Sequence, residues 1–172
     1  MRCHGALVDV CGAGVLLLGP SGVGKSECAL ELVHRGHRLV ADDVVELERT
    51  GPGAVVGRPL ESIRHYMEIR GLGILSILDL FGEKAVCDET RVDLVCHLDP
   101  PGDAAKYERV GMERPTESVA GAEIPCVTLP SRPAGSMATV VEVAVRDQQL
   151  RARGVNAAAR LDARVRREMG KS

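Results

Sequence analysis

A short glycine-rich stretch constrains this chain more than any other feature: Gly19-Pro20-Ser21-Gly22-Val23-Gly24-Lys25-Ser26 has the P-loop spacing G-x-x-x-x-G-K-S. It follows an apolar run over 15–18 and precedes a helical pattern over 26–35, which is the order that a P-loop requires. The glycines let backbone amides turn toward a phosphate. Lys25 can reach the outer phosphates, and the Ser26 hydroxyl can ligate magnesium near the helix N-terminus. The stretch therefore predicts a nucleotide or polyphosphate site.

The composition excludes several classes of protein. With 172 residues, of which 45% are hydrophobic, the chain fits one compact domain over 1–172 rather than a disordered segment. It has no Trp, one Phe and two Tyr, and its net charge is −2, so neither stacking surfaces nor a basic footprint favour nucleic acid. No apolar run approaches the length of a membrane span, and the first residues are no signal peptide. We expect a cytoplasmic protein with no membrane or nucleic-acid partner.

The six cysteines are scattered along the chain, without a C-x-x-C pair or a zinc-ligand spacing. Several lie in apolar stretches, which favours buried reduced thiols over disulfides.

Hydrophobic patterning predicts a mixed α/β fold with the P-loop on a central strand. Strands are expected over 5–10, 15–18, 39–41, 44–48, 54–56, 92–98 and 124–129. Helices are expected over 26–35, 59–66, 137–153 and 156–169, the last of them rich in arginine. The two glycines in 67–74 favour a loop of defined shape, and 99–103 is expected to be a surface loop.

Two consecutive acids, Asp42 and Asp43, end a predicted strand that we expect beside the P-loop strand. Because neighbouring strand residues point to opposite faces, one acid should face the metal and phosphates, and the other a substrate hydroxyl. A carboxylate in that second position can act as general base for an attacking hydroxyl. The alternative is a pair of solvated acids in a turn.

Several segments together resemble the HPr kinase/phosphorylase family. They are His4-Gly5 before 7–10, the P-loop, the run 35–43, and Met67-Glu68-Ile69-Arg70-Gly71-Leu72-Gly73-Ile74, with shorter agreement at 80–82, 85–86 and 107–109. The resemblance implies an α/β, P-loop-containing kinase domain, similar to phosphoenolpyruvate carboxykinase, with a mixed central sheet flanked by helices. It also implies that the N-terminal domain of longer relatives is absent, as a natural short form or a truncation.

What the resemblance implies about function is a bifunctional enzyme. Such proteins phosphorylate a serine of HPr, the phosphocarrier of the sugar phosphotransferase system, with ATP or pyrophosphate, and they need Mg²⁺. They reverse the reaction with inorganic phosphate and release pyrophosphate. The resemblance further implies a homo-oligomer, a hexamer, and a partner surface for HPr on the C-terminal helices.

The resemblance also implies roles for single residues. Asp43 would be the proton acceptor in the kinase direction and the donor in the reverse one, with Asp42 beside it. Ser26 and Glu68 would hold magnesium. The remaining expected site residues are the catalytic His4, Lys25 and Arg109, and the further residues Met67, Ile69, Arg70, Gly71 and Arg132. Without the resemblance, His4 and Arg109 are better interpreted as solvated surface residues. A salt-bridged turn explains Glu68 with Arg70 as well as a functional site does.

One segment departs from the family pattern. Relatives carry an Arg-Pro-Gly-Arg-Asn type loop before the closing helices, tied to dephosphorylation. Here the run is Arg132-Pro133-Ala134-Gly135-Ser136, which keeps the first arginine and loses the second together with the asparagine. The missing guanidinium removes a bidentate phosphate ligand. We therefore predict that phosphorolysis is weakened relative to the kinase reaction.

Two other functions stay open at the level of sequence. A small-molecule P-loop kinase would need a mobile lid with several arginines, and no arginine-dense insertion follows the P-loop helix. A nucleotide-sensing interaction module would bind ATP without transfer. The residues Lys25, Asp43 and Glu68 argue against such a module, whereas the altered 132–136 loop keeps it open.

Overall fold

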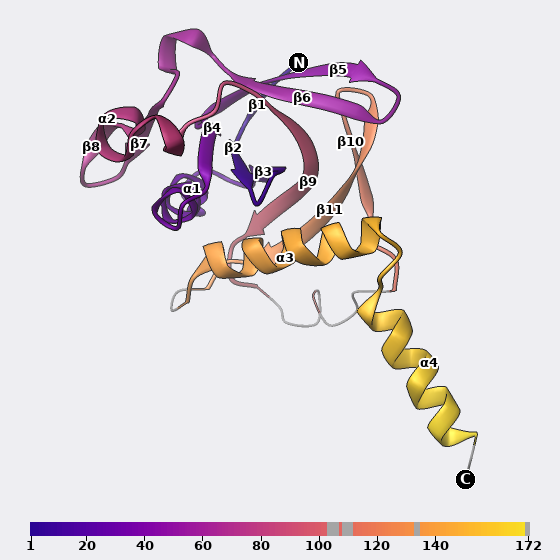
Figure 1. Cartoon of the computed structure of the whole chain (residues 1–172). Coiled ribbons are helices and arrows are strands. Elements are labelled where there is room, and N and C mark those ends of the chain that lie inside the picture. The colour runs from indigo at the N-terminus through magenta and orange to yellow at the C-terminus, as the bar shows by residue number, and fades with distance from the viewer. Residues whose placement is uncertain (103–106, 108–111, 133–134, 171–172) are drawn as a thin grey trace.

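Strand β3 (Ala13–Leu18) lies in the middle of a nine-stranded mixed sheet, and the P-loop begins where this strand ends. The computed structural model describes residues 1–102, 107, 112–132 and 135–170 (Figure 1). The other strands are β1 (Arg2–His4), β2 (Ala6–Val10), β4 (Arg38–Ala41), β5 (Val44–Gly51), β6 (Ala54–Pro59), β7 (Tyr66–Ile69), β8 (Gly73–Ser76), β9 (Thr90–Asp99), β10 (Thr116–Val119) and β11 (Ala122–Pro130). The helices are α1 (Lys25–His34), α2 (Ile77–Phe81), α3 (Met137–Ala152) and α4 (Ala157–Met169), with 3₁₀ turns at Glu61–Ile63 and Glu83–Ala85.

The sheet runs in the order β1-β5-β6-β9-β3-β2-β4, and β11 adds to β9 with β10 outside it. Strand β3 pairs in parallel with β9, where Leu16 lies opposite Val95, and antiparallel with β2, where Val15 lies opposite Val8. The prediction of a P-loop on a central strand of a mixed sheet is confirmed. The expectation that Asp42 and Asp43 follow a neighbour of that strand is wrong, because β2 lies between β3 and β4.

The two faces of the sheet have separate cores. Helices α1 and α3 cover one face, where Leu32 and Val141 belong to the same apolar cluster as Leu17. On the other face Leu16 belongs to a cluster with Val45 of β5. Successive residues of a strand point to opposite faces, so the continuous apolar run of β3 serves both cores. This explains why β2 and β3 are buried almost throughout.

Other sequence predictions differ from the structure between residues 59 and 76. The expected helix over 59–66 is wrong: β6 ends at Pro59, a single 3₁₀ turn follows, and β7 begins at Tyr66. The expected loop over 67–74 is also wrong, because β7 and β8 pair as an antiparallel hairpin, with Glu68 opposite Ile74. Strands β1 and β10 and helix α2 were not predicted.

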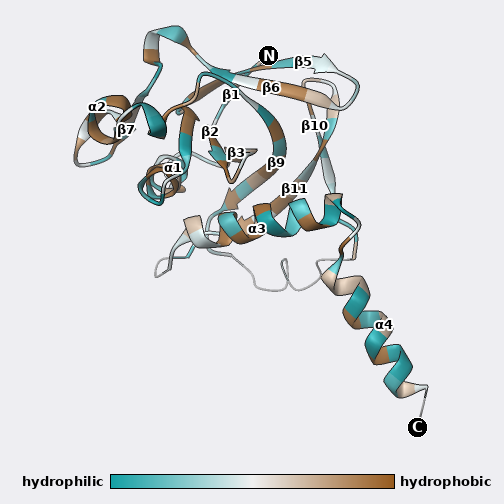
Figure 2. Cartoon of the chain, in the orientation of Figure 1, coloured by the Kyte–Doolittle hydropathy of each residue, from teal (hydrophilic) through white to brown (hydrophobic). Residues whose placement is uncertain are grey.

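The two C-terminal helices were predicted and have different environments. Helix α3 buries Ala138, Val141 and Val145, and Ser136 caps it by accepting a hydrogen bond from the Thr139 amide at 3.1 Å. Helix α4 has no buried residue and extends away from the rest of the fold (Figure 1). Its surface is mostly hydrophilic with isolated apolar positions (Figure 2).

The six cysteines are all free, as predicted, and Cys28 and Cys96 are buried. Burial raises the pKa of the Cys28 thiol to about 12, so it stays protonated and unreactive near neutral pH.

Among the described helices, none is both long and apolar enough to cross a bilayer.

Candidate active site

The P-loop connects the end of β3 to the start of α1 and depends on glycine at its two ends. Gly19 has φ 144°, and a Cβ there would lie 2.3 Å from the Leu98 carbonyl oxygen, so no larger residue fits. Gly24 has φ 102° and precedes the first helical residue, Lys25, while its carbonyl accepts the Cys28 amide at 2.9 Å. The loop therefore leads directly into a helix N-terminus, where the partial positive charge favours an anion.

Lys25 lies over this loop. Its Nζ donates hydrogen bonds to the carbonyl oxygens of Gly19, at 2.8 Å, and of Pro20, at 3.1 Å. Both acceptors are backbone atoms of the P-loop itself, so the ammonium group is held where phosphates would bind. The expected role of Lys25 as a phosphate ligand fits this position.

Ser26 and Asp42 are the most closely linked pair of predicted site residues. The Ser26 hydroxyl lies 3.0 Å from each carboxylate oxygen of Asp42, whose side chain is buried. Burial raises the pKa of Asp42 to about 6, and the neighbouring Asp43 carboxylate acts in the same direction. Hydrogen bonds from Ser26 and from the backbone amides of Asp43 and Glu68 oppose the rise without cancelling it.

Asp43 differs from Asp42 in backbone conformation, exposure and contacts. It has φ 68°, a left-handed conformation that turns the chain between β4 and β5, and its carbonyl accepts the Gly5 amide at 3.0 Å. Its side chain is 77% exposed, and its Oδ1 lies 3.8 Å from His4 Nδ1. The turn, rather than strand alternation, separates the two acids: one points inward to Ser26 and the other is open to solvent.

A cavity of about 600 Å³ brings most of the predicted residues together. Strand β7 contributes to it through alternation: Met67 and Ile69 are buried beneath, whereas Glu68, with Arg70 just after the strand, faces the cavity. Gly5 and Glu27 also line it and were not singled out from the sequence. The lining residues are His4, Gly5, Gly19, Ser21, Gly22, Gly24, Lys25, Ser26, Glu27, Asp42, Asp43, Glu68 and Arg70.

The cavity offers oxygen donors that suit magnesium. Among the residues that the structure describes, no group of three His, Cys, Asp or Glu side chains forms a ready cage for a metal ion. The donors nearest the P-loop serine include the Ser26 hydroxyl itself and the Asp42 carboxylate, and the carboxylates of Glu68, Asp43 and Glu27 also line the cavity. Magnesium is usually held by one or two carboxylates together with substrate phosphates, so this donor set fits a Mg²⁺–phosphate complex rather than a free ion.

Two predicted arginines stand apart from this cavity. Arg132 lines a neighbouring hollow of about 330 Å³, next to Val23 and Gly24 of the P-loop. That hollow shares Gly24 and Glu27 with the main cavity. Arg109 lies outside the described residues. The structure thus brings His4, the P-loop, both aspartates, Glu68 and Arg70 together, and places Arg132 beside them.

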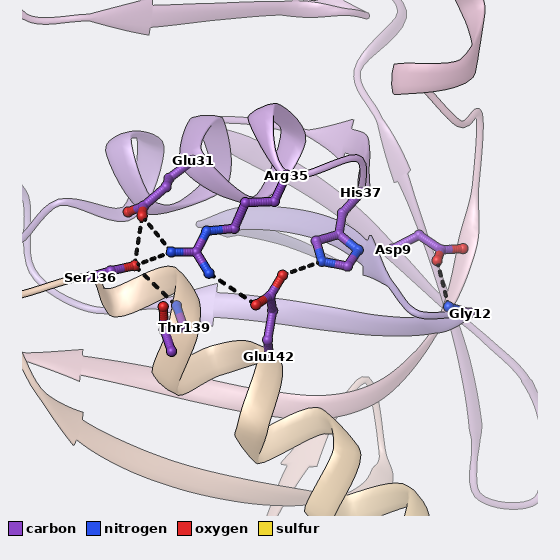
Figure 3. A network of polar contacts seen from close by, with 8 residues as sticks. All are labelled: Asp9, Gly12, Glu31, Arg35, His37, Ser136, Thr139 and Glu142. Atoms are coloured by element: carbon purple, nitrogen blue, oxygen red, sulfur yellow. Dashed lines mark hydrogen bonds and ion pairs between the residues drawn. The ribbon is translucent and has the colours of Figure 1, made fainter.

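A polar network that sequence reasoning missed joins the end of α1 to the start of α3 (Figure 3). Arg35 donates to Glu142 at 3.0 Å and to Ser136 at 2.9 Å, and His37 Nε2 lies 2.6 Å from Glu142. The His37 and Arg35 contacts hold the pKa of Glu142 below its usual value. Only the i,i+4 spacing of Glu31 and Arg35 was visible in the sequence.

Comparison with known proteins gives consistent matches. The family described as "HPr Serine kinase C-terminal domain" matches residues 1–165. The HPr kinase/phosphorylase of Exiguobacterium sibiricum is 48% identical over 155 residues, which are 90% of this chain and 50% of that protein. The protein of the same name from Geobacillus thermodenitrificans is 48% identical over 162 residues, which are 94% of this chain and 52% of that protein.

Comparison with solved structures points to the same family as the sequence comparisons. The structure of the HPr(Ser) kinase/phosphatase from Coxiella burnetii superposes with a TM-score of 0.79 at 29% identity, covering 90% of this chain and 93% of that one. The α/β P-loop kinase fold is thereby confirmed. The chain spans about half the length of the curated relatives it matches.

Proposed function

The chain belongs to the HPr serine kinase C-terminal domain family, and on that premise we propose that it transfers a phosphoryl group to a serine of HPr. The donor is ATP or pyrophosphate, and inorganic phosphate reverses the transfer with release of pyrophosphate. The observation that carries the proposal is the different placement of the two acids: Asp42 is buried on Ser26, and Asp43 is exposed at the cavity beside His4.

In the kinase direction, the serine oxygen attacks the terminal phosphorus, the bond to the bridging oxygen of the donor breaks, and the serine proton passes to Asp43. A base that is 77% exposed can be reached by a side chain presented on another protein. Lys25 and the P-loop amides stabilise charge on the phosphates. In reverse, an oxygen of inorganic phosphate attacks the phosphoserine, and Asp43 returns the proton to the departing serine oxygen.

We propose that Ser26, Asp42 and Glu68 hold magnesium together with the donor phosphates, and that a bound ion would neutralise phosphate charge. His4, whose Nδ1 lies 3.8 Å from Asp43 Oδ1, orients that carboxylate. Arg70 faces the same cavity and is suited to contact a phosphate. The role of Arg109 rests on the family pattern alone, whereas Arg132 also lines a hollow beside the P-loop.

Exposed apolar side chains at the rim of the cavity favour a protein, rather than a small metabolite, as the phosphoryl acceptor. The hairpin that supplies Glu68 also carries two exposed apolar side chains, Leu72 at 70% and Ile74 at 71%. Ile74 lies directly opposite Glu68 across the hairpin. Exposed apolar residues grouped beside a reactive site are typical of a protein docking surface.

The remaining expectations also stand as proposals. We propose that residues 1–172 act as one catalytic domain, that the assembled protein is a hexamer, and that it works in the cytoplasm, where its six free thiols would stay reduced. A partner surface on the C-terminal helices is consistent with the unburied length of α4.

The decisive experiment incubates the chain with Mg²⁺, HPr and labelled ATP, and then with labelled pyrophosphate. Serine phosphate on HPr supports the proposal. Label on a metabolite added from a cell extract would instead indicate a small-molecule kinase, and bound but intact nucleotide would indicate a sensing module.

A further inference from the structure

We propose that Arg35 and Glu142 are positioning residues for the reverse reaction, because they hold the loop that carries Arg132 against the P-loop helix. The inference rests on the proposed function and deepens it. It concerns a group of four residues, called here the α1–α3 clamp: Glu31, Arg35, Ser136 and Glu142 (Figure 3).

Arg35 is the centre of the clamp. Its guanidinium donates to Glu31 at 2.9 Å within α1, to Ser136 at 2.9 Å and to Glu142 at 3.0 Å. Two of its three partners therefore belong to α3 or to the residue that caps it. A planar guanidinium matches such a set of acceptors in a way that no other side chain can. The guanidinium of Arg35 therefore fixes the end of α1 relative to the start of α3.

Ser136 ties the clamp to the loop before α3. Its hydroxyl accepts from the Thr139 amide as the helix cap, accepts from Arg35, and donates to Glu31 at 2.6 Å. The single hydroxyl thus uses its one proton and both acceptor sites. The first turn of α3 and the residue just before it cannot shift relative to α1 without breaking at least one of these bonds.

The described residues of the segment before α3 lie beside the phosphate-binding loop. Arg132 and Gly135 line a hollow whose opposite wall includes Val23, Gly24 and Glu27. Ser131, at the other end of the loop, donates its amide to the Asp99 carbonyl at the end of β9, at 2.7 Å. The described residues on either side of positions 133–134 are therefore anchored, Ser131 by the end of β9 and Ser136 by the clamp, next to the start of α1.

The charges of the clamp are partly shielded from water. The side chains of Arg35 and Glu142 are 32% and 21% exposed, and His37, which also contacts Glu142, is 13% exposed. Charge-assisted hydrogen bonds in such surroundings are stronger than exposed surface pairs. If Arg35 is neutralised, Glu31 loses a cationic partner and Ser136 loses a donor. The expected consequence is a looser start of α3, and with it a less defined position for Arg132.

The test compares Arg35→Gln and Glu142→Gln with the unaltered chain in three assays: HPr phosphorylation by ATP, phosphorolysis of serine-phosphorylated HPr, and calorimetric titration with magnesium pyrophosphate. We expect the KM for inorganic phosphate and the Kd for pyrophosphate to rise about tenfold, and kcat with saturating ATP to stay within about threefold. Arg35→Lys keeps the positive charge but lacks the planar guanidinium, so its KM for phosphate and Kd for pyrophosphate should lie between those of the unaltered chain and of Arg35→Gln.

The matched control is Arg38→Gln. It breaks another arginine–carboxylate pair of similar length, Arg38 to Asp9 at 2.7 Å, whose side chains have no hydrogen bond or ion pair with the described residues of α3 or of the segment before it. Its thermal midpoint should fall by a comparable amount without a change in the phosphate KM. Equal losses in the two reactions for the clamp variants, or the same phosphate defect in Arg38→Gln, would show that the clamp only stabilises the fold and would overturn the proposal.

A double-variant cycle with Arg132→Ala separates positioning from stability. If the clamp acts through Arg132, then adding Arg35→Gln to Arg132→Ala causes no further loss of pyrophosphate affinity. Additive losses, or an Arg132→Ala variant with unchanged affinity, would contradict the inference. Because this readout needs no HPr, it stays informative even if the unaltered chain fails to phosphorylate HPr, a result that would refute the proposed function separately.

Discussion

The Ser26 hydroxyl lies 3.0 Å from both carboxylate oxygens of Asp42, and this contact joins the first turn of α1 to the end of β4. Ser26 follows β3 by way of the P-loop, and Asp42 follows β4. Because β2 lies between these two strands, the contact joins segments that follow strands that are not neighbours in the sheet. Asp42 is thereby held inside the cavity, where burial raises its pKa, while the side chain of the adjacent Asp43 is exposed to solvent.

The raised pKa of Asp42 predicts that this residue lowers the stability of the protein at neutral pH. Its ordinary pKa is 3.8 and its pKa in the fold is about 6. Between these values the folded protein keeps a proton that the unfolded chain releases, so the free energy of unfolding falls as pH rises through this window. The shift corresponds to a loss of roughly 1–3 kcal/mol above pH 6.

Asp42→Asn should therefore be more stable than the unaltered chain at pH 7.5 in EDTA, and less active with ATP and Mg²⁺. The stability difference should shrink as the pH falls toward 4. Chemical denaturation over pH 4–8 measures it, with Asp79→Asn, which changes an exposed carboxylate on α2, as control. A difference that is constant with pH would contradict the prediction.

Asp43 is expected to carry the proton transfer in both directions. Asp43→Asn removes the acceptor while leaving the P-loop and the Ser26–Asp42 contact in place, so transfer should fall about 10²–10⁴-fold with nucleotide affinity nearly unchanged. Rapid-mixing assays of HPr phosphorylation and a nucleotide titration measure the two quantities. Retention of a large part of the transfer rate would remove Asp43 from the mechanism.

The hairpin rim is expected to set affinity for the acceptor protein. Replacing Leu72 and Ile74 by serine removes two exposed apolar side chains, so the KM for HPr should rise about 5–30-fold while the KM for ATP is kept. The matched control replaces Leu80 of α2 by serine, an exposed apolar side chain that lies neither on the hairpin nor on the C-terminal helices. An unchanged KM for HPr, or an equal rise in the control, would argue against docking at the rim.

Sequence reasoning succeeded where the signal is local. The P-loop and the strand and helix that flank it are contiguous, so their order and spacing can be recognised in one short stretch of sequence. The hairpin β7–β8 was mistaken for a loop because its strands have four residues each and its glycines, Gly71 and Gly73, form the turn with positive φ. Four residues are too few for a clear period-two pattern.

Relationships across long sequence separations could not be predicted. The position of β4 beyond β2 follows from strand pairing, which the order of elements does not reveal. Arg35 and Glu142 are 107 positions apart, and nothing in either local sequence marks them as partners. That one of Asp42 and Asp43 points inward was expected, but the cause was not, because the two acids are separated by a left-handed turn at Asp43 rather than by strand alternation.

The altered loop before α3 predicts weak phosphorolysis for a reason that involves the backbone as well as the lost side chain. Gly135 occupies the place of the second family arginine and has φ 153°, a conformation that side-chain-bearing residues rarely adopt. Gly135→Arg alone should therefore not restore phosphorolysis, and it should cost about 1–3 kcal/mol of stability. Assays of serine-phosphorylated HPr with inorganic phosphate, beside denaturation curves, measure both effects. Phosphorolysis as fast as the kinase reaction in the unaltered chain, or a strong gain in Gly135→Arg without loss of stability, would show that this loop does not limit the reverse reaction.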